Sequence, residues 1–561
     1  MTDTGARRAS ARDAAEVAIE RRRSRPELNV WTSLVPDGEL RTDAARVDRA
    51  VAHGAALPLA GLSFAVKDNI DVARVPTTAG CRAFSYTPER SSPVVAQLRE
   101  AGALFVGKTN LDQFATGLVG TRSPDFGLCR NPVDPAYIAG GSSAGSAIAV
   151  ATGMVDLALA TDTAGSGRVP AACCGIVGLK PTRGLISTRG VVPASRSFDC
   201  VTWLTTSVRD AARLHARSAR AGGERLVPTR VRIGVPIDVA WFGEHDAAAR
   251  FEAAVAQLAA AGAELVPIAI EPFVAAGKLL YGSALATERV AAFGAFAAAH
   301  PDAMDPTVLA IVTEAARHRG TDVVDAFEQL AQHRERTRPT WDAVDMLVVP
   351  TIVRHPTIEE VLEDPFGPNS QLGTYTNFVN LLDLCAMAVP AGLRADGLPF
   401  GVSLVAPAHA EALLFATAAV LTGEPSPPVP RRTRLAVVGA HLSGEPLNHQ
   451  LLELGARLVT ATTTAPEYRL FDLGTTPARP GMVRQLSTGA AIALEVWEFD
   501  AESLGTFLPR VPAPLAIGSV ELADGSTVLG FLCESYALDG ARDITEYGGW
   551  RAYRAAARPA P

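Results

Sequence analysis

Residues 139–170 read AGGSSAGSAIAVATGMVDLALATDTAGSGRVP and place two serine-bearing glycine turns on either side of one apolar segment. The first turn holds Ser142 and Ser143, and the second holds Ser166, 24 positions after Ser142. This stretch contains no histidine. A serine hydroxyl attacks a carbonyl group effectively only when a base accepts its proton. The pattern therefore raises the question of which side chain is the base.

Short apolar runs alternate with helical segments around this stretch, from residue 59 to residue 205. Such alternation is typical of an α/β domain, in which helices cover a sheet. Later apolar runs predict further strands of the same sheet, at RVRIGVPID (230–238), DMLVVPT (345–351) and GVSLVAP (401–407). Alanine-rich segments at 246–262 and 273–299 predict helices between them.

The composition changes at LTGEPSPPVPRRTR, residues 421–434, whose prolines and polar residues favour neither helix nor sheet. After it come short β-like runs separated by Gly, Pro and Asp turns, which predict a compact, mostly β domain. We therefore expect a first domain over residues 1–420, a linker over 421–433 and a second domain over 434–561.

The overall charge argues against a nucleic-acid partner. The net charge of −7 arises from 59 acidic and 52 basic residues, which are interleaved along the chain and form no basic stripe.

No run reaches eighteen apolar residues, and the Arg-rich N-terminus lacks the apolar core of a targeting signal. We expect no membrane span and a cytoplasmic protein.

The cysteines also favour a cytoplasmic protein, and their spacing indicates no metal site. The chain has seven, scattered and without zinc-ligand spacing, so we expect reduced thiols and no bound metal. The lysines are more informative, because only four of the 52 basic residues are lysines: Lys67, Lys108, Lys180 and Lys278. A buried lysine can lose its proton and act as a base, which arginine cannot do.

One of these lysines belongs to a phosphate-loop pattern. GALFVGKT, residues 102–109, satisfies G-x-x-x-x-G-K-[ST]. A phosphate loop follows a strand and keeps its middle irregular, whereas here ALFV itself has the composition of a strand and the residues before it are helical. The context therefore argues against nucleotide binding.

A second pattern would make Ser143 the nucleophile. Residues 141–145, GSSAG, fit the G-x-S-x-G elbow of α/β-hydrolases, which also requires an acid and then a histidine later in the chain. Histidines at positions 215, 245, 300, 318, 333, 355 and 409 follow, but none lies in a Gly/Asp-rich loop of the expected kind. This alternative ranks below the next one.

The third interpretation combines both turns with Lys67 in GLSFAVKDNID. Burial among apolar and hydroxyl groups would lower the lysine pKa from about 10.4 and make it a base for a serine. The second serine could then relay the proton. In TDTAGSG, consecutive backbone N–H groups of Thr163, Ala164, Gly165 and Ser166 could form an oxyanion hole.

The motifs GGSSAGSA, TDTAGSGRVPAACCGIVGLKPTRG and AVKDNID together resemble the amidase signature family of Ser-cisSer-Lys hydrolases, over roughly residues 59–205. The resemblance implies a mixed, mainly parallel sheet covered by helices. It implies Ser166 as the nucleophile, Ser142 as the bridging serine after a non-proline cis peptide, and Lys67 as the base. The sequence departs from the commonest family sequence in two places, at Ala144 and at Thr163-Ala164, and neither change removes a catalytic atom.

The wording TDTAGSGRVPA is similar to the allophanate hydrolase branch of this family. In LLYGSALATERVAAF, the resemblance implies that Tyr281 and Arg289, eight positions apart on one helix, hold a substrate carboxylate. The planar fork of arginine suits a carboxylate. No cofactor is implied.

The segment after the linker resembles the C-terminal domain of allophanate hydrolases, which is similar in fold to γ-glutamyl cyclotransferases. In that branch the first domain deaminates allophanate to N-carboxycarbamate, and the second is implicated in decarboxylation. Candidate polar residues in the second domain are His441, Asn448, His449 and Glu534.

The resemblance leads us to expect an allophanate-hydrolysing homodimer in urea or triazine nitrogen catabolism, with a functional link to a urea carboxylase. Two alternatives stay open. One is an amidase of the same family that acts on malonamate, a fatty amide or another small amide. The other is the glutaminase subunit of a tRNA amidotransferase, against which the extra domain argues.

Overall fold

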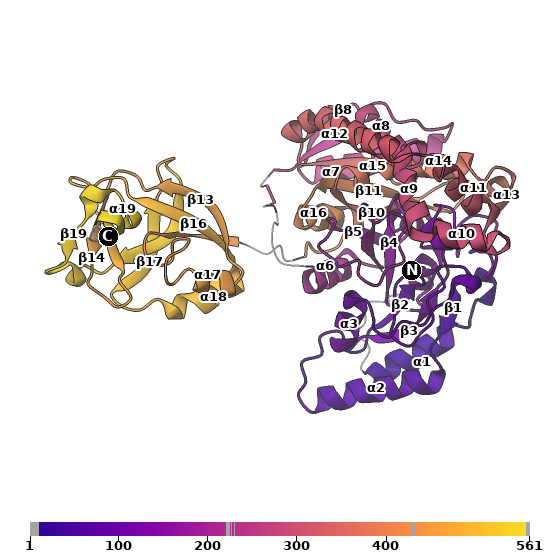
Figure 1. Ribbon diagram of the computed structural model, residues 1–561, viewed down its shortest axis with the longest axis horizontal. Helices are drawn as coiled ribbons and strands as arrows, with labels where there is room; N and C mark the ends of the chain where they lie inside the picture. The colour runs from indigo at the N-terminus through magenta and orange to yellow at the C-terminus, as the bar shows by residue number, and fades with distance from the viewer. Residues whose placement is uncertain (1–9, 220–224, 226, 229, 428–431, 557–561) are drawn as a thin grey trace. The chain divides into compact units, whose positions relative to one another are not determined.

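A computed structural model of the 561-residue chain describes residues 10–219, 225, 227–228, 230–427 and 432–556. The chain divides into two compact units, Met1–Pro427 and Pro428–Pro561 (Figure 1). Helix α16 (Glu411–Thr422) is the last element of the first unit, and strand β12 (Arg432–Val437) is the first element of the second. Residues 428–431 of the predicted linker lie outside the described part.

The first unit is built on an eleven-stranded sheet with the order β1-β3-β2-β4-β6-β5-β10-β11-β9-β7-β8. Its strands are β1 (Trp31–Leu34), β2 (Ser63–Lys67), β3 (Leu104–Thr109), β4 (Leu157–Asp162), β5 (Val177–Lys180), β6 (Cys200–Thr205), β7 (Arg232–Pro236), β8 (Glu264–Ile268), β9 (Met346–Pro350), β10 (Leu384–Leu393) and β11 (Pro399–Pro407).

The sheet is mixed, as predicted, but it is not mainly parallel. Of the ten pairings between its described strands, four are parallel (β2 with β3 and β4, β7 with β8 and β9) and six are antiparallel. Short connections explain part of the difference, because a tight turn can join only antiparallel neighbours. Strands β10 and β11, for example, form a hairpin that closes at a turn containing Gly397, where φ is +83°.

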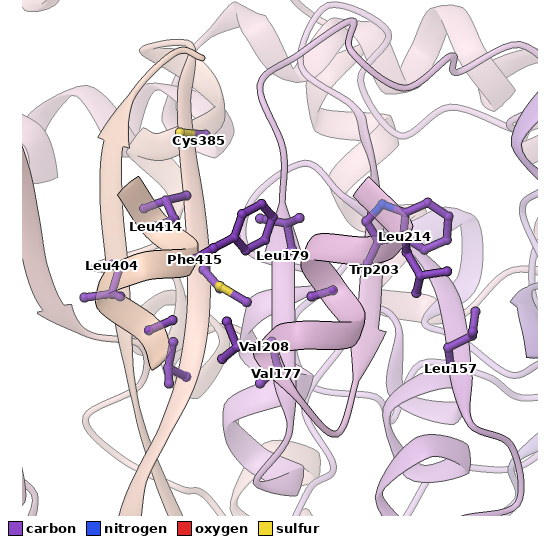
Figure 2. Close-up of a cluster of buried hydrophobic side chains, with 14 of the residues drawn as sticks. Leu157, Val177, Leu179, Trp203, Val208, Leu214, Cys385, Leu404, Leu414 and Phe415 are labelled. Carbon is purple, nitrogen blue, oxygen red and sulfur yellow. The ribbon is translucent and has the colours of Figure 1, made fainter. Parts of the chain in front are cut away.

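Successive side chains of a strand point to opposite faces of the sheet, and each face has its own apolar packing. In β4, Leu157 and Leu159 belong to one cluster, and Ala158 and Ala160 to another. The first face packs against α3 (Pro93–Glu100), α6 (Val208–Ser218), α7 (His245–Ala260) and α16. Figure 2 shows part of this core, where Leu214 of α6 and Phe415 of α16 lie over Leu179 of β5 and Trp203 of β6.

The opposite face carries two further groups of helices. At one end lie α1 (Ala11–Arg21), α2 (Asp37–Ala52), α4 (Ala144–Ala151) and α5 (Arg168–Cys174). At the other lie α8 (Glu271–Gly282), α12 (Gly320–Ala343), α14 (Gly367–Gly373) and α15 (Asn377–Leu381). Within the described residues, no helix combines the length and the apolar character needed to cross a membrane.

The alanine-rich segment 273–299 is not one helix, contrary to the prediction. Helix α8 ends at Gly282, and Ser283 is extended (φ −139°, ψ 178°). A 3₁₀ turn (Ala284–Ala286), the three-residue α9 (Thr287–Arg289), a π-helical turn (Val290–Gly294) and α10 (Ala295–Ala299) follow. The Ser283 hydroxyl explains the break, because it donates to the Leu279 carbonyl at 2.6 Å and accepts from the Leu285 N–H at 3.3 Å.

The second unit is mostly β, as predicted. A five-stranded sheet has the order β13-β16-β12-β18-β17, and a three-stranded sheet has the order β15-β14-β19. The strands after β12 are β13 (Arg457–Thr463), β14 (Tyr468–Asp472), β15 (Pro480–Arg484), β16 (Ala493–Asp500), β17 (Leu515–Glu521), β18 (Thr527–Cys533) and β19 (Arg542–Asp543). The described residues of this unit also form three short α-helices: α17 (His449–Glu453), α18 (Ala501–Phe507) and α19 (Trp550–Ala556).

Candidate active site

Lys67 and Ser142 meet inside the first unit. Lys67 is the last residue of β2, and its Nζ donates to Ser142 Oγ at 2.8 Å and to Thr161 Oγ1 at 2.9 Å. Lys67 and Ser142 are both 0% exposed. Ser142 stands two residues before α4, and Thr161 belongs to the neighbouring strand β4. The parallel pairing of β2 with β4 places Lys67 beside Thr161, and the turn before α4 brings the Ser142 hydroxyl to the same amine.

Burial gives Lys67 the protonation behaviour of a base. Desolvation lowers the pKa of Lys67 to about 7, although the carboxylates of Asp112, Asp162 and Asp199 oppose the shift. Since an ordinary lysine pKa is about 10.4, this amine can be neutral in a large fraction of molecules at neutral pH.

The turn that carries Ser142 is tightly packed and admits only glycine before it. The Gly141-Ser142 peptide bond is cis, and the Ser142 carbonyl accepts from the Asp112 N–H at 3.1 Å. A Cβ atom on Gly141 would lie 2.1 Å from Asp112 Oδ2 and 2.6 Å from the Gly120 nitrogen. The GGSS motif thus reflects a close approach between two loops.

The second turn is organised by Asp162, a residue that the sequence analysis did not single out. The Asp162 carboxylate accepts from the N–H groups of Gly165 at 2.9 Å and Gly167 at 3.1 Å, and from Arg168 Nε at 3.0 Å and Nη2 at 2.9 Å. Burial alone would raise the pKa of Asp162, but the Arg168 guanidinium, the Lys180 charge and the Gly167 N–H together hold that pKa below its usual range. A charged carboxylate therefore fixes the loop on which Ser166 lies.

Ser166 stands just before α5 and is 1% exposed. Its carbonyl accepts from the Ser143 N–H at 3.2 Å, which brings the two serine turns together. Helix α15 supports the loop from the other side, because the Thr376 hydroxyl donates to the Ala164 carbonyl at 2.7 Å and Asn380 Nδ2 to the Asp162 carbonyl at 2.7 Å. The three residues predicted as Ser-cisSer-Lys therefore lie at one site.

One of the four predicted oxyanion donors is already occupied. The Gly165 N–H donates to Asp162, because a buried carboxylate must have its hydrogen bonds satisfied. Within the described part of the chain, the N–H groups of Thr163, Ala164 and Ser166 have no hydrogen-bond acceptor, and they remain the candidates.

The elbow and phosphate-loop patterns have structural explanations. The Ser143 hydroxyl donates to the Thr161 carbonyl at 3.2 Å and is 0% exposed, and no hydrogen bond among the described residues joins Ser143 to a histidine. Lys108 lies within β3 and forms a buried ion pair with Asp68, 2.7 Å from Nζ to Oδ1. A strand whose lysine is paired in this way does not form a phosphate cradle.

Tyr281 and Arg289 are brought together, although not by one helix. Tyr281 lies on α8 and Arg289 on α9, and the guanidinium carbon is 4.5 Å from the centroid of the Tyr281 ring. Arg289 is 0% exposed, and neither its Nε nor its Nη1 has a hydrogen-bond partner in the described residues. Two buried guanidinium donors without acceptors cost folding free energy unless a ligand accepts hydrogen bonds from them.

Asp199 contacts the serine loop and interacts electrostatically with Arg289. No sequence motif marks this residue. Its Oδ1 accepts from the Thr163 hydroxyl at 2.5 Å, and its carboxylate also accepts from the N–H groups of Ala194 and Ser195. Burial raises the pKa of Asp199 to about 6, while Thr163, these N–H groups and the Arg289 charge oppose the rise. Arg289 and Lys67 are thus both within electrostatic reach of one carboxylate.

The four candidates in the second unit do not form one cluster. His441 and Asn448 are together, because Asn448 Nδ2 donates to the His441 carbonyl at 2.9 Å. The His441 ring stacks on Phe531, 5.1 Å between centroids, and burial lowers the pKa of His441. His449 is exposed and contacts the Pro446 carbonyl, and Glu534 is exposed at the end of β18.

His441 also lines a small cavity of about 20 Å³ in the second unit, together with Arg479, Pro480 and Phe531. No group of three or more His, Cys, Asp or Glu side chains in the described residues is placed to hold a metal ion. The seven cysteines are all free and buried.

Comparisons with known proteins agree with these two units. The Amidase family model matches residues 14–415, and the model of the allophanate hydrolase C-terminal domain matches residues 433–555. The urea amidolyase of Lachancea kluyveri is 41% identical over 584 residues, which cover 95% of this chain and 32% of that protein. The chain thus spans about a third of the length of the urea amidolyases that it matches.

Two further proteins match over most of their own length. A glutamyl-tRNA(Gln) amidotransferase subunit of Halobacterium salinarum is 36% identical over 65% of this chain and 95% of that protein. The crystallised allophanate hydrolase of Kluyveromyces lactis is 37% identical, with a TM-score of 0.71 over 98% of both chains. With its buried Lys67 and Ser142 beside the Ser166 loop, the chain belongs to the amidase family and carries a C-terminal domain of the allophanate hydrolase type.

Proposed function

We propose that this chain is an allophanate hydrolase that releases ammonia from the terminal amide of allophanate. The observation that carries the proposal is the buried guanidinium of Arg289, which has two unpaired donors and interacts electrostatically with Asp199, as Lys67 of the Lys67–Ser142–Ser166 site also does. An amidase site beside a free buried cation suits a small amide that bears a carboxylate. The similarity to the allophanate hydrolase of Kluyveromyces lactis supports this substrate.

In the first half-reaction, Ser166 Oγ attacks the terminal amide carbonyl. Its proton passes to Ser142 as the Ser142 proton passes to neutral Lys67 Nζ, 2.8 Å away. The backbone N–H groups of Thr163, Ala164 and Ser166 stabilise the oxyanion. The lysine proton then returns through Ser142 to the amide nitrogen, the C–N bond breaks and ammonia leaves an acyl-enzyme.

In the second half-reaction, water attacks the acyl-enzyme and gives up a proton to the same Lys67–Ser142 pair. The ester bond to Ser166 breaks, the proton returns to the Ser166 oxygen, and N-carboxycarbamate leaves. Throughout, Arg289 binds the substrate carboxylate in a bidentate manner, and the Tyr281 ring covers its guanidinium. In this mechanism, residues of the first unit supply the nucleophile, the base, the proton relay and the carboxylate-binding group.

For the second unit we propose the decarboxylation of N-carboxycarbamate. The match to the allophanate hydrolase C-terminal domain supports this role, and the His441 cavity is its candidate place. Of the four predicted residues, His441 and Asn448 are favoured by their contact and burial, whereas His449 and Glu534 are exposed.

The partners follow from the same proposal. The urea amidolyases are about three times as long as this chain, which supports a functional link to a urea carboxylase that would supply allophanate. The homodimer and the cytoplasmic location stay predictions, and light scattering and cell fractionation would test them.

Two related functions make different predictions. An amidase for small amides without a carboxylate would not need a buried arginine without partners, whereas the kcat/KM values for allophanate and malonamate separate the two carboxylate-bearing substrates. A glutaminase role is favoured by the similarity to the glutamyl-tRNA(Gln) amidotransferase protein, but that similarity covers only 65% of this chain. Copurification of a stoichiometric partner, with ammonia released from glutamine, would support the glutaminase.

The decisive experiment incubates the purified chain with allophanate, urea, biuret and malonamate and measures ammonia and carbon dioxide separately. We expect both products from allophanate and the highest kcat/KM for this substrate. Ser166→Ala should abolish ammonia release, whereas Ser143→Ala, which changes the neighbouring serine, should retain activity. Ammonia released equally well from an amide without a carboxylate would contradict the proposal.

A further inference from the structure

Glu288 precedes Arg289 in the chain but does not turn its carboxylate toward that arginine. Its Oε2 accepts from the Ser195 hydroxyl at 2.7 Å and from the Ser197 N–H at 2.9 Å. Ser195 is 0% exposed, so at least one of these bonds lies in the interior. Hydrogen bonds to a charged acceptor are among the stronger ones in proteins. Glu288 therefore anchors α9 firmly to the loop at residues 195–197.

The same loop is attached to the catalytic site at its other end. The N–H groups of Ala194 and Ser195 donate to Asp199 Oδ2 at 3.1 and 3.2 Å, and the Thr163 hydroxyl donates to Asp199 Oδ1 at 2.5 Å. A continuous path thus runs from Glu288 through Ser195 and Asp199 to Thr163. Thr163 is three residues before Ser166, in the loop of the oxyanion donors.

The backbone around Arg289 has an unusual need for such an anchor. Helix α9 is only three residues long and lies between a 3₁₀ turn, Ala284–Ala286, and a π-helical turn, Val290–Gly294. Irregular turns of this kind interrupt the regular i→i−4 hydrogen-bond ladder. A side-chain contact at Glu288 can therefore decide where the neighbouring guanidinium lies.

We propose that Glu288 is a positioning residue that sets Arg289 at the correct distance from Ser166 for a carboxylate-bearing amide. The inference rests on the proposed function. Glu288 itself does not touch the substrate. It acts by joining the carboxylate site to the oxyanion loop, so that a substrate held by its carboxylate presents its amide carbonyl to Ser166.

The test measures how well malonate, a dicarboxylate without an amide, protects Ser166 from a small neutral fluorophosphonate. The labelling rate without malonate reports on Lys67, Ser142 and Ser166, and the half-protecting malonate concentration reports on the carboxylate site. The variants are Glu288→Ala, Ser195→Ala and their double mutant, all in the full chain. Glu314→Ala is the control, because Glu314 is a 69%-exposed glutamate on α11 (Pro306–Ala315).

We expect Glu288→Ala to raise the half-protecting concentration at least about tenfold, the loss expected for a charged hydrogen bond. The labelling rate without malonate should change by a factor at least about fivefold smaller than the change in the half-protecting concentration. Ser195→Ala should have an intermediate effect, and the double mutant should resemble Glu288→Ala, because both substitutions remove one path. Glu314→Ala should behave as the wild type.

Three outcomes would overturn the inference. Wild-type protection in Glu288→Ala would show that the anchor does not position Arg289. A parallel loss of labelling and protection, with a lower melting temperature, would show a merely structural role. If malonate does not protect the wild-type chain, carboxylate recognition is wrong, and the proposed function fails together with the role of Glu288. If malonate protects but allophanate is not hydrolysed, only the proposed substrate fails.

Discussion

Lys67 Nζ lies 2.8 Å from Ser142 Oγ, and both side chains are completely buried. This contact places an amine with a pKa of about 7 beside the Ser142 hydroxyl, and the next residue, Ser143, donates its N–H to the Ser166 carbonyl. Burial gives this site a base without a histidine, because it lowers the lysine pKa to the range in which an unperturbed histidine titrates.

Replacement of Lys67 by arginine should abolish amide hydrolysis while leaving the chain folded. Arginine retains the positive charge but stays protonated, so it cannot accept the serine proton. We expect kcat to fall by at least about 10³-fold. Ammonia release and circular dichroism would be measured together. Activity within tenfold of the wild type would show that another group is the base.

The activity should rise with pH through the pKa of Lys67. Burial lowers that pKa to about 7, and the base must be neutral, so kcat/KM should increase tenfold per pH unit below about 7 and level off above it. A pH–rate profile from pH 5 to 9 measures this. A profile that still rises tenfold per unit at pH 9 would mean that Lys67 keeps the pKa of a free amine.

Arg289→Gln should damage carboxylate-bearing substrates selectively. The substitution removes the charge but retains a polar side chain, and the loss of a bidentate pair should cost about 2–4 kcal/mol in kcat/KM. The matched comparison is malonamate against malonamide, which differ at the carboxylate. An equal loss for both amides would contradict carboxylate binding by Arg289. Tyr281→Phe should cost less, because the ring face remains.

Gly165→Ala should disturb the Ser166 loop through a steric clash. The new Cβ would lie 2.4 Å from Thr376 Oγ1, and φ is +119°. We expect a loss of about 2 kcal/mol or more in unfolding free energy and a strong loss of activity. Gly184→Ala is the control for backbone strain, because φ there is +83° and its Cβ would meet nothing within 4 Å. Similar effects of both variants would exclude the clash as the cause.

Lys108→Met should destabilise the first unit and leave Asp68 as a buried, unpaired charge. Such a loss costs about 3–5 kcal/mol, and Asp68→Asn in the same chain should restore part of it. Denaturant unfolding measures both effects. ATP should not change the melting temperature of the wild-type chain, since Lys108 is paired within the fold. Stabilisation by ATP would revive the phosphate-loop interpretation.

The sequence by itself determined the chemical class and the main elements. Lys67, Ser142 and Ser166 could be proposed as catalytic residues because each lies in a local motif whose glycines and apolar neighbours are required by close packing or burial, as the 2.1 Å approach at Gly141 shows. The alternation of apolar runs predicted the α/β domain, and the Gly- and Pro-rich turns predicted the mostly β unit, because such periodicities follow directly from helix and strand geometry.

Only the tertiary structure decided the relations between distant segments. The directions of the strands depend on how connections cross the sheet, so the predicted mainly parallel sheet was wrong. The helix across Tyr281 and Arg289 is broken by a hydrogen bond of Ser283, which the alanine-rich pattern hides. Asp199 serves the site from 36 residues beyond Thr163 and has no motif of its own. Contacts between segments far apart in the chain are set by packing, and that information is not local in the sequence.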